Sequence, residues 1–176
     1  VDDRHEQLAI EHIKTERIDF EQIERGRLHR VDADVVHCGV FVQGGTLGNV
    51  SALVAARHAA QLDRGDERPA RWVVACSADA HSSIAHAARV MDIDILTVPS
   101  DANGRLTGDR LEEALVARDE ADVFAVVATG GTTNYGIVDD LKGVARVCAD
   151  RGIWMHVDGA YGLAGLAAPS VRDLFS

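Results

Sequence analysis

The chain of 176 residues is long enough for one domain with a sizeable core, and its 47% hydrophobic and 26% charged residues are typical of a globular protein. Its formal net charge of -10 argues against general nucleic-acid binding and against binding to an anionic membrane surface. No apolar run approaches the length of a membrane span, and the first residues do not resemble a signal peptide.

The three cysteines, Cys38, Cys76 and Cys148, are odd in number, far apart and without a CxxC pair. This pattern favours reduced thiols in a cytoplasmic protein over a disulfide framework or a zinc site. We therefore expect no metal centre, and we expect the cysteines to fill the core or lie at the surface rather than act as nucleophiles.

Residues 1–38 differ from the rest of the chain. They are dense in charge, and their sparse apolar residues do not keep one helical stripe. The histidines in this region have no metal-binding spacing. We expect a charged helical arm here, separate from residues 39–176.

From residue 39 onward, apolar strands alternate with helical patterns, which predicts βαβ units and a mostly parallel α/β sheet with helices on both faces. The Ala-rich helix over 47–62 is apolar on most faces, which predicts burial on two sides. The expected elements, in chain order, are a strand over 39–42, a helix over 47–62, a strand over 71–76, a helix over 81–91, a strand over 93–98, a loop over 99–108, a helix capped by Asp109 and running to about 118, a strand over 123–128, a helix opened by Asp139 or Asp140 and ended by Gly152, and a buried strand over 153–157.

Four of these strands are followed by short polar motifs. The turn 43–46 leads into a helix N-terminus, where free N–H groups and the helix dipole favour an anion. His81 opens a helix, Thr129 begins a loop rich in glycine and threonine, and Asp158 ends the last strand. Each motif has an ordinary structural alternative: a tight turn, a histidine bonded to its neighbour, a threonine-rich turn and a capping aspartate.

Taken together, the four motifs predict a site for a single ligand. The carboxyl ends of parallel strands share an edge of the sheet, where ligands bind. A carboxylate there is costly unless a cation meets it, so we expect Asp158 to hold a protonated ligand nitrogen. The imidazole of His81 can stack on a ring or move a proton. An anionic phosphate, a flat ring and a basic ring nitrogen are features of pyridoxal 5′-phosphate.

The stretch from residue 39 to about residue 166 resembles the group II pyridoxal-phosphate-dependent decarboxylases, which include aromatic-amino-acid, histidine and glutamate decarboxylases. Four motifs in the family's order carry the resemblance. They span residues 39–49 with 52–57, residues 80–84, residues 127–133 with Gly136 and the pair Asp139-Asp140, and residues 154–162.

The resemblance implies the aspartate-aminotransferase-like large domain of fold type I, incomplete here, and decarboxylation of an L-amino acid. His81 would stack on the pyridine ring and help to orient the substrate carboxylate, and Asp158 would pair with the ring nitrogen. These two residues are the implied catalytic residues. The residues implied to bind the cofactor are Gly45 and Thr46 at the phosphate, His81 and Ala160 on the two faces of the ring, Thr129 near its phenolic oxygen, and Asp158.

The resemblance also implies a lysine that holds the cofactor as a Schiff base. The chain has only Lys14 and Lys142, and neither matches the family lysine, which follows a further helix and strand after the Asp158 motif. Gly159 stands where the family usually has an alanine, and Leu163 where a glycine is common. We therefore expect a fragment of a longer decarboxylase that is inactive by itself.

Two alternatives remain open: a non-catalytic protein that binds the cofactor or serves as a partner subunit, and another fold-type-I enzyme such as an aminotransferase or lyase. The resemblance implies a homodimer acting on a small-molecule amino acid, without a nucleic-acid or membrane partner. Which amino acid is the substrate is not readable, because the family's selectivity residues come largely from outside this stretch and from the partner subunit.

Overall fold

The computed structural model describes residues 40–65, 67–118 and 122–175. The predicted charged arm, together with Cys38, lies outside the described residues. Residues 42–175 belong to one compact unit.

Four parallel strands form the sheet. They are β1 (Val73–Ser77), β2 (Asp94–Val98), β3 (Val123–Thr129) and β4 (Trp154–Asp158). Their order across the sheet is β2-β1-β3-β4. In the pairing of β3 with β4, Thr129 lies beside Asp158, so these two residues end neighbouring strands at the same edge.

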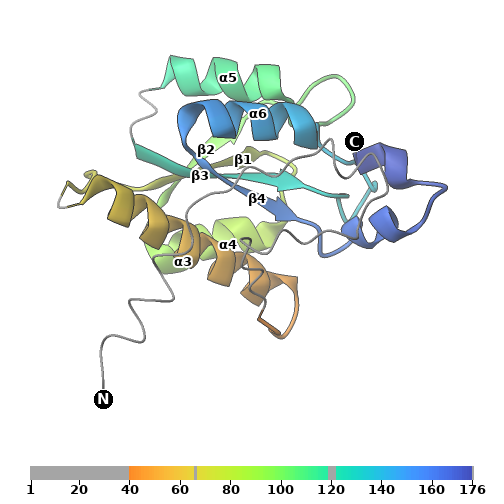
Figure 1. Cartoon of the computed structure of the whole chain (residues 1–176), viewed down its shortest axis with the longest axis horizontal. Coiled ribbons are helices and arrows are strands. Elements are labelled where there is room, and N and C mark those ends of the chain that lie inside the picture. Colours follow the sequence, from red (N-terminus) through yellow and green to blue (C-terminus); the bar gives the residue numbers. More distant parts are fainter. Residues whose placement is uncertain (1–39, 66, 119–121, 176) are drawn as a thin grey trace, which may run out of the picture. The chain divides into compact units, whose positions relative to one another are not determined.

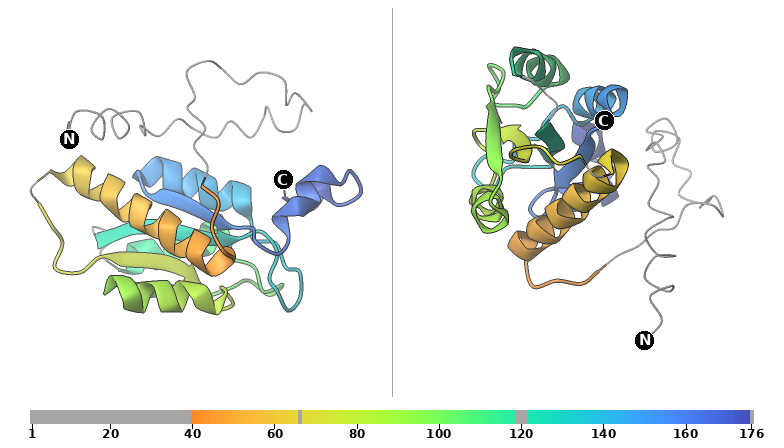
Figure 2. Two further views of the ribbon diagram at one scale, coloured as in Figure 1. Left: turned by 90° about the horizontal axis from the view of Figure 1, so that it is seen from below. Right: turned by 90° about the vertical axis from the view of Figure 1, so that its left-hand side faces the viewer.

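Helices cover both faces of the sheet, as the alternating pattern predicts (Figure 1). Helices α3 (Gly45–Arg64) and α4 (Ser82–Met91) pack side by side on one face, and α5 (Gly108–Ala117) and α6 (Leu141–Arg151) pack side by side on the other (Figure 2). Two short 3-10 helices, η2 (Leu163–Ala167) and η3 (Arg172–Phe175), follow β4.

The sheet separates two hydrophobic cores. Side chains of α5 and α6 such as Leu111 and Val144 fill one core, and side chains of α3 and α4 such as Leu53 and Ile84 fill the other. Each core is closed by alternate residues of the strands, because successive side chains of a strand point to opposite faces. The thiols of Cys76 and Cys148 are free and buried in these cores, which confirms their expected role as core residues.

Three sequence predictions are wrong in this part of the chain. Residues 40–42 form no strand, because no described strand pairs with their backbone. Helix α3 is buried on one side only, and Leu47, Val54 and Leu62 are exposed. Residues 154–157 of β4 are half-buried rather than buried, because β4 lies at an edge of the described sheet.

The helix ends follow the expected capping chemistry with one correction. Helix α5 is capped by Thr107 rather than Asp109, since the Thr107 hydroxyl accepts a hydrogen bond from the N–H of Arg110 at 3.3 Å. Asp140 caps α6 through the N–H of Gly143 at 2.9 Å. Gly152 ends α6 in the left-handed conformation, as predicted.

Asp139, which precedes the α6 cap residue Asp140, connects two loops through hydrogen bonds of its side chain. Its carboxylate accepts hydrogen bonds from the backbone N–H of Thr129 at 2.6 Å and from that of Leu106 at 2.7 Å. Burial raises the pKa of this carboxyl above its ordinary value, and the two N–H donors act in the opposite direction. The side chain thus fixes the point at which the chain leaves β3.

Asp139→Asn is expected to lower the free energy of unfolding by about 1–3 kcal/mol, because an amide nitrogen cannot accept and one buried N–H loses its partner. Urea unfolding of the whole protein that carries this chain measures the loss. Asp109→Asn is the matched control, because Asp109 is exposed and caps no helix. Equal unfolding midpoints for the two variants would contradict the role of Asp139.

Candidate functional site

Three strand ends and one helix start meet at the carboxyl edge of the sheet. The chain reaches His81 after β1, Thr129 ends β3, Asp158 ends β4, and Gly45 begins α3. The sequence predicted four strand ends at this edge. The first of these four positions is only the N-terminus of α3, because the described chain has no strand before this helix.

Asp158 is the buried charge of this edge. Its side chain is only 8% exposed. One carboxylate oxygen accepts a hydrogen bond from the Asn49 amide at 2.9 Å, and the other accepts one from the N–H of Ala160 at 3.3 Å. Among the described residues, no lysine or arginine forms an ion pair with it. Such a carboxylate is stabilised when a cationic group approaches its remaining lone pairs.

Asn49 lies at the centre of a hydrogen-bond network. It is 4% exposed and shares the buried side of α3 with Leu53 and Ala56. Besides its bond to Asp158, the Asn49 amide nitrogen donates to the hydroxyl of Ser83 at 2.8 Å. Its carbonyl oxygen lies 2.8 Å from Nε2 of His156. One side chain of α3 therefore joins β4 to the start of α4.

His81 caps α4. Its Nδ1 accepts a hydrogen bond from the N–H of Ser83 at 3.2 Å and lies 2.9 Å from the Ser83 hydroxyl. The residue is otherwise exposed at the carboxyl edge of the sheet. The predicted alternative of a helix-start histidine bonded to its neighbour is therefore correct. It is compatible with a ligand-binding role, because the residue is exposed and both of these contacts use Nδ1 rather than Nε2.

The N-terminus of α3 lies against the turn that follows β4. A Cβ atom on Gly45 would lie 2.7 Å from that of Ala160, so only a glycine lets the two segments approach this closely. Within the described residues no side chain caps α3, and Thr46 is exposed in its first turn. Free N–H groups at such a helix start suit an anion.

The loops after β3 and β4 also approach each other through glycines. A Cβ atom on Gly131 would lie 2.9 Å from the Cα atom of Gly162, and Gly131 has a positive φ of 107°. The N–H of Gly130 donates to the carbonyl of Asp158 at 2.9 Å. These contacts hold the buried Thr129 beside Asp158.

Gly159 and Leu163 both depart from the family pattern, and the smaller residue at 159 makes space for the larger one at 163. A Cβ atom on Gly159 would lie 2.3 Å from the Cβ atom of Leu163. The missing methyl group at 159, where an alanine is usual, leaves the space that the larger side chain at 163 occupies. Leu163 in turn packs against the core on the α5 and α6 side.

Gly159→Ala is therefore expected to lower the free energy of unfolding by about 1–3 kcal/mol through overpacking. Adding Leu163→Gly is expected to relieve this clash, so the double variant loses less stability than the sum of the two single variants. Urea unfolding of all three variants measures the coupling.

Gly48→Ala is the matched control for this pair, because its new Cβ atom would meet only Val42, at 3.6 Å, and alanine favours a helix. It is expected to cost no stability. Strictly additive effects of Gly159→Ala and Leu163→Gly would show that the two positions are independent.

His156 is a half-buried imidazole on the same side of β4 as Asp158, two residues away. Burial lowers its pKa below the ordinary value, and the nearby charge of Asp158 acts in the opposite direction. The neutral ring is therefore the form that the folded protein favours.

This shift predicts a loss of stability in acid. Below about pH 6.5 the unfolded chain takes up a proton at His156 that the folded protein resists, so stability falls as the pH falls. His156→Gln is expected to reduce the slope of stability against pH below about pH 6.5. Urea unfolding at several pH values measures the slope, and an unchanged slope would contradict the assignment.

Asn49, Ser83 and His156 lie within the recognised sequence motifs, but no role at the site was predicted for them. The sequence does contain a signal for a role of Asn49. It is spaced i, i+4 and i+7 with Leu53 and Ala56, so it lies on the buried stripe of the helix, and a buried polar side chain needs hydrogen-bond partners. The partners themselves depend on contacts between distant segments, which no local pattern shows.

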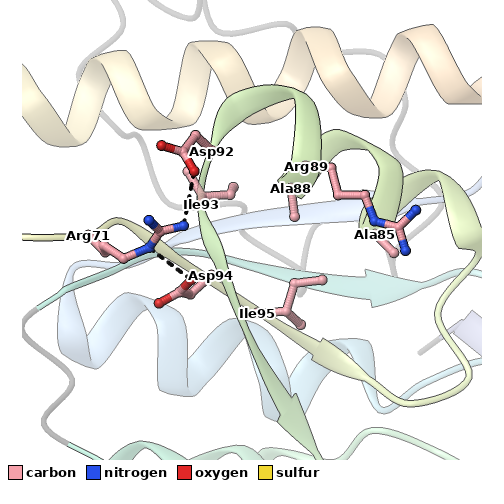
Figure 3. Close-up of a pocket in the computed structure, with 8 residues that line it drawn as sticks. All are labelled: Arg71, Ala85, Ala88, Arg89, Asp92, Ile93, Asp94 and Ile95. Carbon is pink, nitrogen blue, oxygen red and sulfur yellow. Dashed lines mark hydrogen bonds and ion pairs between the residues drawn. The ribbon is translucent and has the colours of Figure 1, made fainter.

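A surface groove lies at the opposite edge of the sheet, where β2 begins (Figure 3). Two arginines line it, Arg71 and Arg89, and the Arg71 guanidinium bonds Asp92 at 3.1 Å and Asp94 at 3.0 Å. Because both arginines and both aspartates are substantially exposed, the groove lacks the buried polar groups that mark the carboxyl edge of the sheet. In the described part of the chain no cluster of side chains could hold a metal ion. Nor is any described helix long and apolar enough to span a membrane.

The edge of the sheet thus carries a buried carboxylate, an exposed imidazole and an uncapped helix start, the set expected for a pyridoxal phosphate site. The model of the pyridoxal-dependent decarboxylase conserved domain matches residues 26–176. The chain belongs to this family.

Its relatives act on different amino acids. The chain is 37% identical over 129 residues to L-2,4-diaminobutyrate decarboxylase of Rhizobium meliloti (strain 1021), covering 70% of the chain and 25% of that protein. It is 34% identical over 144 residues to cysteine sulfinic acid decarboxylase of Mus musculus, covering 77% and 29%. The solved structure of Oryza sativa TDC with PLP and tryptamine matches with a TM-score of 0.69 and 32% identity, over 77% of the chain and 30% of that structure. The chain therefore spans between a quarter and a third of the length of these proteins.

Proposed function

We propose that the protein carrying this chain decarboxylates an L-amino acid with the help of pyridoxal 5′-phosphate, and that the chain supplies the part of the site that faces the cofactor ring. The observation that carries the proposal is Asp158, a carboxylate 8% exposed that meets no described cation at the edge of a parallel sheet. The protonated pyridine nitrogen of the cofactor is the cation that this position suits.

The other side chains fit the same group. The free N–H groups at the start of α3 suit its phosphate, with Gly45 and Thr46 as the contacting residues. His81 is exposed beside this edge, with Nδ1 held by Ser83. Thr129 is adjacent to Asp158 in the sheet, and Ala160 donates its N–H to the same carboxylate. The donor set is therefore compatible with a phosphate, a ring and a ring nitrogen.

Each residue has a defined task in this mechanism. Asp158 keeps a proton on the ring nitrogen through its negative charge. Bound pyridoxal phosphate supplies an electron sink for the pair left when carbon dioxide departs. His81 would cover one face of the ring and offer Nε2 to the substrate carboxylate, while Ala160 would cover the other face. Holding the substrate in this orientation before the bond breaks is itself a source of rate enhancement.

The similar relatives do not select one substrate. Proteins named for a diamino acid and for a sulfinic acid are 37% and 34% identical to the chain, and a structure holding tryptamine is 32% identical. We therefore propose an amino-acid substrate without choosing its side chain.

We also propose the remaining features that the resemblance implies. The Schiff-base lysine would come from a part of the whole protein that follows the matched motifs, because neither Lys14 nor Lys142 matches it. The protein would be a cytoplasmic homodimer, with residues 1–38 as an arm distinct from the large domain. The exposed Leu47, Val54 and Leu62 on one side of α3 support burial of this side in the whole protein.

Asp158→Asn tests the proposed function. In the whole protein loaded with pyridoxal phosphate, it is expected to lower the rate of carbon dioxide release by roughly 100-fold or more, the size typical of losing one preorganised electrostatic contact. Cofactor affinity is expected to fall less, because the phosphate contacts of α3 remain. Both are measured after screening diamino, acidic and aromatic L-amino acids.

Asp150→Asn is the matched control, since Asp150 is exposed on α6. Unchanged turnover in Asp158→Asn would remove Asp158 from the mechanism. Stoichiometric cofactor binding by the wild type without activity on any amino acid would favour the non-catalytic alternative.

A further inference from the structure

We propose that Asn49 is a positioning residue that couples Asp158 to His81 and fixes where the protons of this site reside. The inference rests on the proposed function, because His81 and Asp158 are its cofactor residues. Asn49 has no place among the proposed cofactor residues, but its side chain bonds to Asp158, Ser83 and His156, which shape the site.

The orientation of the Asn49 amide follows from its partners. The carboxylate of Asp158 can only accept, so the group 2.9 Å from it is the amide nitrogen. The carbonyl oxygen then faces Nε2 of His156 at 2.8 Å. A carbonyl can only accept, so Nε2 of His156 carries a proton. Because burial lowers the pKa of His156, its Nδ1 carries none.

The Ser83 hydroxyl links Asn49 to His81. The second hydrogen of the Asn49 amide points at the Ser83 hydroxyl oxygen at 2.8 Å, and this leaves the hydroxyl hydrogen free to point elsewhere. The remaining neighbour of that hydroxyl is Nδ1 of His81, at 2.9 Å. Nδ1 also accepts the N–H of Ser83. Two donors thus meet Nδ1, so Nδ1 acts as an acceptor and the ring N–H resides on Nε2.

This arrangement has a consequence for the reaction. One N–H of the Asn49 amide points at the carboxylate of Asp158, the proposed partner of the ring nitrogen. The other points at the Ser83 hydroxyl, whose own O–H points at the imidazole of His81, the residue proposed to cover the ring. The Asp158 carboxylate is thereby held in place by the Asn49 amide, and His81 offers an N–H donor at Nε2, which suits a substrate carboxylate. Removing Asn49 releases both groups at once, although neither is itself changed.

A double-mutant cycle on turnover tests the coupling. In the whole protein with bound pyridoxal phosphate, Asn49→Ala is expected to lower kcat about 10- to 100-fold, the size of effect produced by small misplacements of reacting groups, with a smaller change in KM. Ser83→Ala is expected to lower kcat less, because the backbone N–H still holds Nδ1. The double variant is expected to be about as slow as Asn49→Ala, since the two residues act as a unit.

Asn103→Ala is the matched control, because Asn103 is exposed and only its backbone N–H is bonded. Single effects that multiply in the double variant would overturn the coupling while leaving the proposed function intact. Failure of the wild type to bind pyridoxal phosphate would overturn the proposed function, and this inference with it.

A measurement on the unaltered, cofactor-free protein guards against variants that fail to fold. Nitrogen-15 NMR of histidine-labelled protein reports which ring nitrogen of His156 and of His81 carries the proton, with signals assigned by His156→Gln and His81→Gln. Protonated Nε2 in both rings is expected. A proton on Nδ1 of His156 would reverse the Asn49 amide and overturn the inference.

Discussion

The carboxylate of Asp158 is buried at the end of an edge strand, and its charge sets the requirements for the residues around it. A buried charge without partners would cost several kcal/mol, so the fold must supply donors and, in the working protein, a cation. The described residues supply only neutral donors, the Asn49 amide and the N–H of Ala160. Each of them occupies one lone pair of a carboxylate oxygen, and the remaining lone pairs can accept from a charged ligand atom.

The α/β architecture brings the remaining groups to this carboxylate. Parallel strands end at the same edge, so Thr129 and Asp158 become neighbours through register alone. Helix α3 reaches the same place because Gly45 can approach Ala160 closely, and the loops after β3 and β4 approach each other at Gly131 and Gly162. The N-terminus of α3 and the acid at the end of β4 therefore lie at one edge, although more than a hundred residues separate them in the sequence.

Much of this arrangement could be predicted from the sequence. Alternating strand and helix patterns were sufficient for the parallel sheet with helices on both faces, and the strand-end position of Asp158 indicated a ligand edge. Predictions that depended on neighbours were less successful. Residues 40–42 of the expected first strand are not in a strand, and β4 is half-buried because it lies at an edge of the described sheet. The roles of Asn49 and Ser83 depend on contacts between α3, α4 and β4, which periodicity does not reveal. The compensation between Gly159 and Leu163 likewise appeared only when the turn after β4 was seen in space.

The central claim is that Asp158 holds the ring nitrogen of pyridoxal phosphate. The most direct measurement is the distance between the two in a crystal structure of the whole protein with the cofactor bound. The account predicts a charge-assisted hydrogen bond of about 2.7–2.9 Å between a carboxylate oxygen of Asp158 and the pyridine nitrogen. A cofactor bound with its nitrogen facing another group, or out of hydrogen-bond reach of Asp158, would contradict it.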